Sequence, residues 1–530
     1  MKKLVYISLI ALAGFTTSCS DDLLETYAPG QITSDVAFQS SSDLRAMLNS
    51  AYGVMANRSE AEFVSVFTDE VGIGYANGGQ GLTDDYVFFL APFSAGPSNI
   101  WTNNYLALAR INRVIEFADT VTPKDPADAA VIAGLKAQAL TMRAYCHLNI
   151  LSYFTTDMKS DAALAGVLSN RLFAADDNDY PRATNGEFYS LIHSDLDAAI
   201  NTFTTIPGSN PAAASASAYA NSNFAKGLKA RAYAYKGDYA NAETWANTVI
   251  ASSGISLATK TQYNGVFLNE SNPQSVEVIF ELKRTPAQNN QDTNLHNAWA
   301  SIRPDLNGSP FYEVSRALHN KLNPSNAPAT SLTGANMDIR ANTIIAPSSV
   351  IDPGYASSPN YRDSDVIVIN KHGGTATAGT ATWATTGTNQ NNNDFKIMRI
   401  SEMYLIKAEA RAAAGDLAGA AAAVKSLRDV RTGSANTVVY PTVQDAWRGI
   451  MNERRIEFAY EGYRFIDIKR LGALAGQGID RDPADYSSAT SNFPGGNPAN
   501  LPLTSYKWAL PIPNVETDVN TAVQQNPGYN

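Results

Sequence analysis

The sequence predicts a mainly α-helical protein, in which helical hairpins pack against an irregular, loop-rich half with a few short strands. Three observations support this fold class. Apolar residues recur at helical spacing through residues 41–251 and again after residue 394. Between residues 252 and 393, Gly, Asn, Pro, Ser and Thr dominate. A repeated sequence also links two helical segments that lie far apart in the chain.

Each helix is expected from the spacing of its apolar residues. The first follows a Ser cap and places Leu44, Leu48 and Tyr52 on one face. The second places Leu108 and Ile111 on one face, and the third is rich in Ala. In chain order, the expected helices are 44–55, 99–118, 127–154, 185–203, 219–236, 239–251, 395–414, 417–431 and 443–470.

Strands and loops are expected in the less regular parts of the chain. Short runs of β-forming residues predict strands at 276–282 and 366–369. The Gly-rich stretches 72–81 and 373–393 are expected to be loops, and the Pro-rich end of the chain is expected to be irregular.

An internal repeat indicates stacked helical hairpins. Residues 229–243 align with residues 407–421, and the shared positions include alanines and a Gly-Asp pair. Gly237 and its counterpart Gly415 are expected to end one helix in a left-handed conformation, and the Asp after each Gly to cap the next helix. The pattern resembles the tetratricopeptide hairpin. Because such hairpins bury their apolar faces only against one another, the stack should be assembled from both ends of the chain.

The first residues predict export and lipidation. Two Lys precede an apolar run that ends in Thr16-Thr17-Ser18-Cys19. The run is too short to span a bilayer of about 30 Å, so residues 1–18 are interpreted as a signal peptide. Small residues before a lone Cys predict lipid on Cys19, with residues 19–40 as a lipidated tether. Ordinary cleavage beside an uninvolved Cys is the alternative.

Composition and motifs limit the classes of function. The formal net charge of −10 argues against nucleic acid as a partner. The five His are scattered, and the sequence has no recognisable metal-ligand spacing, Walker loop or Gly-x-Ser-x-Gly elbow. We therefore predict no metal, no cofactor and no catalytic residue, so the protein is not expected to be an enzyme. Cys146 lies in an apolar helix and is expected to be a buried, unreactive thiol.

A charge-dense helix near the C-terminus is the strongest candidate for chemistry. Glu457 and Glu461 are four residues apart and on one helix would lie roughly 6 Å apart, as the two carboxylates of a glycosidase can. A general acid needs a raised pKa, whereas Arg454, Arg455 and Arg464 are expected to crowd both glutamates and keep them ionised. A structural lattice of ion pairs is therefore expected rather than a catalytic pair.

The same helix resembles the signature of the SusD/RagB family, the starch- and nutrient-binding outer-membrane lipoproteins of Bacteroidetes. The matching residues are Glu453, Arg454, Arg455, Glu457, Glu461, Gly462, Arg464, Phe465, Asp467 and Arg470. The ending of the family also matches, at Leu510-Pro511-Ile512-Pro513, Glu516, Asn520 and 525–529. Further similar stretches, at 101–112, 142–145 and 400–410, extend the resemblance over essentially the whole chain.

The resemblance implies a lipid-anchored protein at the cell surface of the outer membrane, with a TonB-dependent porin as its partner. It would act as a hinged lid over the barrel, capture an oligosaccharide or peptide nutrient, and deliver it to the barrel. The family fold has tetratricopeptide-like hairpins under an irregular, ligand-binding half, and its members lack catalytic residues. The expected regions are an N-terminal helical region, 41–251, and a C-terminal region, 252–530, divided into a ligand-binding part, 252–393, and helices with a Pro-rich tail, 394–530.

Candidate ligand contacts lie in irregular segments. Aromatic rings can cover the apolar faces of a sugar while polar side chains hold its hydroxyls. The candidates are Trp299 with Arg303 and Asp305, Tyr75 with Asn77, and Trp383. The other tryptophans lie on helices or before the Pro-rich tail and are expected in the core, namely Trp101, Trp245, Trp447 and Trp508.

Two other functions remain open on the sequence alone. A repeat adaptor would bind another protein through its helical groove, and a glycoside hydrolase would cleave the glycan. A pull-down on immobilised glycans distinguishes nutrient binding from the adaptor, and release of reducing sugar would identify a hydrolase.

Overall fold

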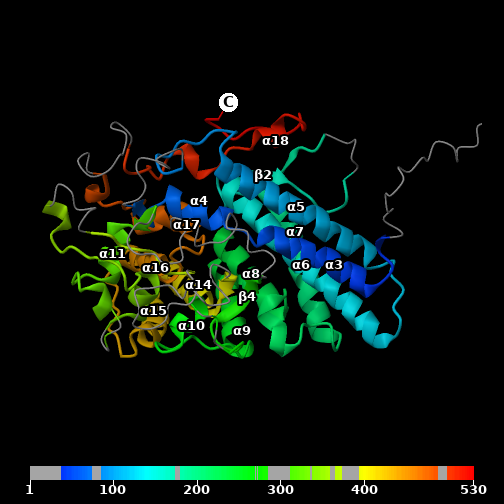
Figure 1. Cartoon of the computed structure of the whole chain (residues 1–530). Coiled ribbons are helices and arrows are strands. Elements are labelled where there is room, and N and C mark those ends of the chain that lie inside the picture. The colour runs from blue at the N-terminus through cyan, green and yellow to red at the C-terminus, as the bar shows by residue number, and fades with distance from the viewer. Residues whose placement is uncertain are drawn as a thin grey trace, which may run out of the picture.

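The structure is a computed structural model that describes residues 37–74, 85–173, 179–268, 270, 273–284, 311–332, 334, 337–357, 365–372, 393–486 and 498–529. It is mainly helical with a few short strands, which confirms the predicted fold class. The long N-terminal helices lie on one side of the molecule, and the C-terminal helices lie on the other side among irregular segments (Figure 1).

Four long helices form the N-terminal side: α3 (Ser41–Met55), α5 (Ala95–Phe117), α6 (Pro126–Phe154) and α7 (Asn185–Thr205). Each packs against the next in this order. Local sequence explains where they start. The Asp125 side chain accepts from the backbone N–H of Asp128 and Pro126 follows it, while Thr184 and Glu187 form a capping box at the start of α7.

The two repeat units form hairpins, as the sequence predicts: α8 (Ser222–Lys236) with α9 (Tyr239–Ser252), and α14 (Ile400–Ala413) with α15 (Leu417–Thr432). Gly237 and Gly415 have φ of 85° and 75°, a region that costs other residues strain. The Asp after each Gly accepts from a backbone N–H of the next helix. α14 packs against both α8 and α9, so the stack is indeed assembled from distant parts of the chain.

The described strands form small antiparallel sheets of two strands each. β1 (Val71–Ile73) pairs with β5 (Tyr312–Val314), β2 (Leu164–Val167) with β3 (Arg182–Thr184), and β4 (Val278–Leu282) with β6 (Phe395–Arg399). The strand predicted at 366–369 is present only as isolated bridges, Val366 to Val350 and Ile369 to Ile345. Gly72 lies within β1, so the first predicted loop starts later than expected.

Two predicted helices are wrong in part. The first five residues of the predicted helix 395–414 are strand β6, because they pair with β4. The predicted helix 443–470 is two helices, α16 (Val443–Glu457) and α17 (Arg464–Ala475). Between them the backbone turns through left-handed positions at Tyr460, with φ of 63°, and Gly462, with φ of 84°. We call residues 458–463 the α16–α17 turn.

Several short helices were not predicted, because each is too short to show a helical period. They are α4 (Ser59–Phe67), α10 (Tyr263–Phe267), α11 (Arg316–Leu322), α12 (Ile339–Ile344) and α18 (Asn514–Thr517). Short 3-10 helices also occur at Ala213–Ala218, Ala329–Ser331, Tyr355–Ser357, Pro483–Tyr486 and Tyr506–Trp508.

One large apolar core joins the helices of both sides. Trp101, Trp447 and Trp508 are buried in it, as predicted. Trp245 is only half-buried and packs at the edge of the core, with Lys229 Nζ 4.8 Å from its ring centre. Cys146 is fully buried, and burial raises the pKa of its thiol. Among the described helices, none is both long and apolar enough to cross a membrane.

The C-terminal tail is fastened to the end of α6. The backbone N–H of Leu510 donates to Tyr153 O at 2.9 Å, and Asn526 Nδ2 donates to Phe154 O at 2.7 Å. Arg182 Nη1 in turn donates to Asn526 Oδ1 at 2.9 Å. The last segment of the chain therefore lies over the N-terminal helices, near the C label of Figure 1.

Candidate functional site

A cluster of ion pairs lies where the helical stack meets the loop-rich part. Its centre is Glu457, the last residue of α16, whose carboxylate accepts from Arg399, Arg431 and Arg340 at 2.6, 2.8 and 3.1 Å. Although burial opposes ionisation, Arg431, Arg399 and Arg340 hold the pKa of Glu457 well below its usual range. The ion-pair cluster contains equal numbers of acidic and basic groups, namely Glu277, Asp338, Glu453, Glu457 and Glu461 with Arg340, Lys371, Arg399, Arg428 and Arg431.

The predicted geometry of the two glutamates is wrong. Because α16 ends at Glu457, Glu461 lies in the α16–α17 turn and does not share a helix face with it. Glu461 instead contacts Lys371 at 2.6 Å and Arg399 at 2.8 Å. Arginines and a lysine from other segments, and not the neighbours in sequence, therefore supply the counter-charges of these glutamates.

The arginines that were expected beside Glu457 and Glu461 contact other carboxylates. Arg455 and Arg464 reach back to Asp69, near the N-terminal side of the chain, while Arg454 and Arg470 join α16 to α17 and α14. Burial opposes the ionisation of Asp69, but Arg455 and Arg464 lower its pKa nevertheless. The pairs are Arg455–Asp69, Arg464–Asp69, Arg454–Asp467, Arg470–Asp467 and Arg470–Glu409.

The ion-pair cluster also fixes the α16–α17 turn. Lys371 Nζ and Arg399 Nη2 both donate to the carbonyl oxygen of Glu457, at 3.1 and 2.8 Å. Gly462 follows with positive φ, where a side chain would strain the backbone. These contacts position the tyrosines of the turn, which form one wall of a pocket.

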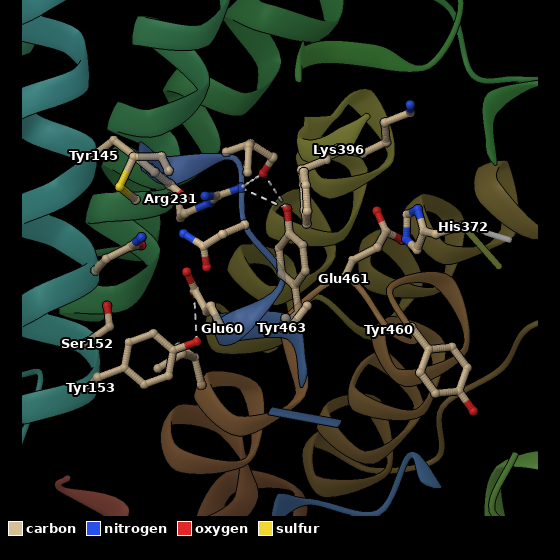
Figure 2. Close-up of a pocket in the computed structure, with 18 of the residues that line it drawn as sticks. Glu60, Tyr145, Ser152, Tyr153, Arg231, His372, Lys396, Tyr460, Glu461 and Tyr463 are labelled. Atoms are coloured by element: carbon tan, nitrogen blue, oxygen red, sulfur yellow. Dashed lines mark hydrogen bonds between the residues drawn. The ribbon is translucent and has the colours of Figure 1, made fainter. Parts of the chain in front are cut away.

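The pocket lies between α6, α8, the start of α4, β6 and the α16–α17 turn (Figure 2). The space between these elements, counted out into open solvent, amounts to about 730 Å³. Aromatic and polar side chains alternate around it. The aromatic ones are Tyr145, Tyr153, Tyr235, Phe395, Tyr460 and Tyr463, and the polar ones include Asn57, Glu60, Asn149, Ser152, Arg231, Lys396 and Glu461.

Two polar side chains, Glu60 of α4 and Asn149 of α6, line this pocket. Tyr153 donates its hydroxyl to Glu60 Oε1 at 2.8 Å, the contact drawn in Figure 2. Burial raises the pKa of Glu60, although Tyr153 and Arg231 oppose that rise. The Nδ2 atom of Asn149 is buried and forms no hydrogen bond of normal geometry among the described residues, although the amide opposes the rise that burial causes in the pKa of Tyr145.

Arg231, the cation nearest to Glu60 in this wall, is already neutralised. Its Nε and Nη2 atoms donate to the two oxygens of Glu402 at 2.8 and 2.6 Å, and Nη2 also donates to the Tyr463 hydroxyl at 2.8 Å. The pocket therefore combines ring surfaces with hydrogen-bonding groups of little net charge. Such a lining is suited to binding a polar, uncharged molecule.

A possible metal site is better explained by ion pairs. Glu270, Glu281 and Asp394 bring carboxylate oxygens within 4.8 Å of one another. Lys396 Nζ lies 2.5 Å from Glu270 and 3.1 Å from Glu281, and Lys283 Nζ lies 2.7 Å from Glu281 and 2.6 Å from Asp394. Although burial opposes it, the two lysines lower the pKa of Glu281 to about 2. The ammonium groups occupy the places that a cation would take.

The predicted lipidation and ligand residues lie outside the described residues. They are Cys19, Tyr75, Asn77, Trp299, Arg303, Asp305 and Trp383. The pocket was not predicted from the sequence, because its lining comes from six separate segments. One signal was present: Tyr145, Asn149 and Tyr153 recur every four residues along α6 and therefore share one face of this helix.

Family comparisons cover nearly the whole chain. A family model described as "SusD family" matches residues 196–529, and one described as "Starch-binding associating with outer membrane" matches residues 23–225. A comparison with curated protein sequences finds no match.

Solved structures share the fold at low sequence identity. A putative sugar-binding protein from Bacteroides vulgatus is similar with a TM-score of 0.70 and 21% identity over 93% of this chain and 100% of that one. A SusD superfamily protein from Bacteroides thetaiotaomicron has a TM-score of 0.69 and 20% identity, over 92% and 100%. A laminarin-binding SusD-like protein has a TM-score of 0.63 and 21% identity, over 93% and 100%. Since the first family model alone spans more than half of the sequence, the chain belongs to the SusD family.

Proposed function

We propose that this protein captures a glycan or a peptide at the cell surface and delivers it to a TonB-dependent porin of the outer membrane. The observation that carries the proposal is the family match along nearly the whole chain, including a family model described as starch-binding and associated with the outer membrane. A laminarin-binding protein of the same fold supports a glycan as the ligand.

Attachment to the membrane is proposed to depend on lipid at Cys19. The support is the sequence before it, in which a basic start, a short apolar run and small residues precede a lone Cys. A diacylglycerol together with an amide-linked chain provides the two hydrophobic signals that stable anchoring needs. Residues 19–40 would then be the tether between the membrane and the first described helix.

Binding without catalysis is the second part of the proposal. A glycosidase needs one carboxylic acid with a raised pKa that reaches the scissile bond. Glu457 is fully buried and held ionised by three arginines, so it supplies no proton, and Glu461 is bound by Lys371 and Arg399. The family signature is therefore explained by fold stability and not by chemistry.

Capture of the glycan is proposed to involve the aromatic and polar residues of the irregular segments, Trp299, Arg303, Asp305, Tyr75, Asn77 and Trp383. The support is chemical, since rings and planar polar groups suit a saccharide. A repeat adaptor remains the alternative, and its binding partner would be a protein.

The proposal is tested by expressing the full chain in a Bacteroidetes host, separating membranes from soluble material, and incubating the protein with immobilised glycans. We expect the parent in the membrane fraction and on at least one glycan, with no release of reducing sugar. Cys19→Ala should leave export intact and move the protein to the soluble fraction. Retention on no glycan, or glycan cleavage, would contradict the proposal.

A further inference from the structure

The pocket contains hydrogen-bonding capacity that the described chain leaves unused. Asn149 Nδ2 is buried there without a partner in the described part of the chain. An unpaired buried donor is costly, so such groups are normally bound by water or by a ligand. Glu60 lines the same pocket, and Tyr153 occupies only its Oε1 atom. Oε2 remains able to accept a hydrogen bond.

The charges around the pocket disfavour an anionic ligand. Arg231 and Lys396 line the wall, but carboxylates of the protein already bind both of them. Glu60 forms no ion pair within the described residues, and burial raises the pKa of its carboxyl group. A phosphate, a sulfate or a uronate would therefore meet Glu60 without an available counter-charge.

The walls of the pocket favour a ligand with both apolar and polar faces. Tyr145, Tyr463 and Phe395 line this space, and Figure 2 labels the two tyrosines. Their packing fixes them in place, since Tyr463 stacks on Phe458 with ring centres 4.3 Å apart. A rigid aromatic wall suits the C–H face of a sugar.

We infer that this pocket binds one neutral sugar residue, a hydroxyl of which donates to Glu60 and accepts from Asn149. A hydroxyl group is donor and acceptor at once, whereas an ammonium or a carboxylate could satisfy only one of these partners. The inference rests on the proposed function, because a glycan-capturing protein is exposed to sugars. It adds a site made of helices α4 and α6 to the irregular segments proposed above.

The test is isothermal titration of the full chain with glucose, galactose, mannose and glucuronic acid. We expect saturable binding, at one site per chain, of at least one neutral hexose, and at least about tenfold weaker binding of glucuronic acid, because Glu60 repels its carboxylate. Absence of binding by every neutral hexose, or tighter binding of glucuronic acid, would overturn the inference.

Two isosteric variants then test the hydrogen bonds. Glu60→Gln keeps an acceptor for Tyr153 but turns a donor toward the pocket, and Asn149→Asp removes the donor. Each should weaken hexose binding about fivefold or more. The double variant exchanges donor and acceptor, and a hydroxyl can rotate to suit both arrangements. It should therefore recover affinity to within about threefold of the parent.

Controls separate the possible outcomes. Asn241→Ala, on the exposed start of α9, should leave hexose affinity unchanged, and melting curves show that each variant is folded. Unchanged affinity in both single variants, or additive losses in the double variant, would overturn the inference. If immobilised glycans retain the parent in these cases, the proposed function stands and only the pocket assignment fails. If no glycan retains it, the proposed function fails as well.

Discussion

Glu457→Gln should strongly destabilise the protein, because it removes the central negative charge of the ion-pair cluster. The parent carboxylate accepts from Arg399, Arg431 and Arg340 and has no exposure to water. Gln offers one oxygen in place of two and turns an N–H₂ group toward a guanidinium. The cluster, which holds equal numbers of acidic and basic groups in the parent, is left with one uncompensated buried positive charge.

The expected cost follows from this geometry. Removing one partner of a buried ion pair typically costs about 3–5 kcal/mol, since the remaining charge cannot be solvated. The entropy of unfolding of a chain of about 500 residues corresponds to roughly 1 kcal/mol per degree at the midpoint, so the melting temperature should fall by about 3–5 °C. Glu277 also contacts Arg399 and Arg431 and limits the loss to the lower part of this range.

Differential scanning calorimetry measures this change, with Glu243→Gln as the matched control. Glu243 also pairs with an arginine, Arg411, at 2.6 Å, but the arginine side chain is 39% exposed. An exposed pair is worth about 0–1 kcal/mol, so the control should melt within about 1 °C of the parent. Equal melting temperatures for Glu457→Gln and Glu243→Gln would refute the claim that the buried charges stabilise one another.

The remaining predictions concern pH and the tryptophans. Burial raises the pKa of Glu70 and of Asp485 to about 7. The contribution of these two groups to the free energy of unfolding is therefore fully present below the usual carboxyl pKa of about 4 and is lost as the pH rises toward 7. The melting temperature of the double variant Glu70→Gln, Asp485→Asn should therefore rise relative to that of the parent from about pH 5 to about pH 7.5, and a difference that does not change with pH would disprove this. Trp447→Ala should lower the free energy of unfolding, measured with denaturant, by about 3–5 kcal/mol. Trp245→Ala should lower it clearly less, because the ring of Trp245 is only half-buried, and equal losses would contradict this difference in packing. Trp299→Ala should weaken glycan binding about fivefold or more by titration without changing the melting temperature, whereas unchanged affinity with a large drop in melting temperature would place this ring in the core.

Sequence patterns predicted the long helices well, because a helix of many residues repeats its apolar period several times. The same patterns failed for segments that are too short to repeat an apolar period. Residues 395–399 precede α14 without a break in composition, and only their pairing with β4 identifies them as a strand. The interruption at residues 458–463 depends on a left-handed Tyr460, which propensity does not foresee. The turns at Gly237-Asp238 and Gly415-Asp416 were predictable, because the left-handed Gly and the capping Asp depend only on adjacent residues.

The candidate site was less predictable, because its contacts join distant segments. The sequence indicates that Glu457 and Glu461 need cationic partners, and the arginines nearest to them in the chain were predicted to be those partners. The fold instead supplies Lys371 and Arg399, which precede Glu457 by more than fifty residues. The pocket was missed for the same reason, since Glu60 of α4 and Asn149 of α6 come to line one pocket only in the folded chain.

The fastening of the C-terminal tail to α6 has a consequence for the order in which the protein can fold. Arg182 and the end of α6 obtain part of their hydrogen bonds from residues 510–526, which are made last. The repeat hairpin of α8 and α9 likewise can complete its packing only after α14 has been made, about 150 residues further along the chain. Contacts of such long range form slowly and leave apolar surface uncovered in the meantime. A nascent chain that emerges N-terminus first would therefore depend on holdase chaperones until its final residues arrive, and loss of the last twenty residues would impair maturation far more than their small share of the core suggests.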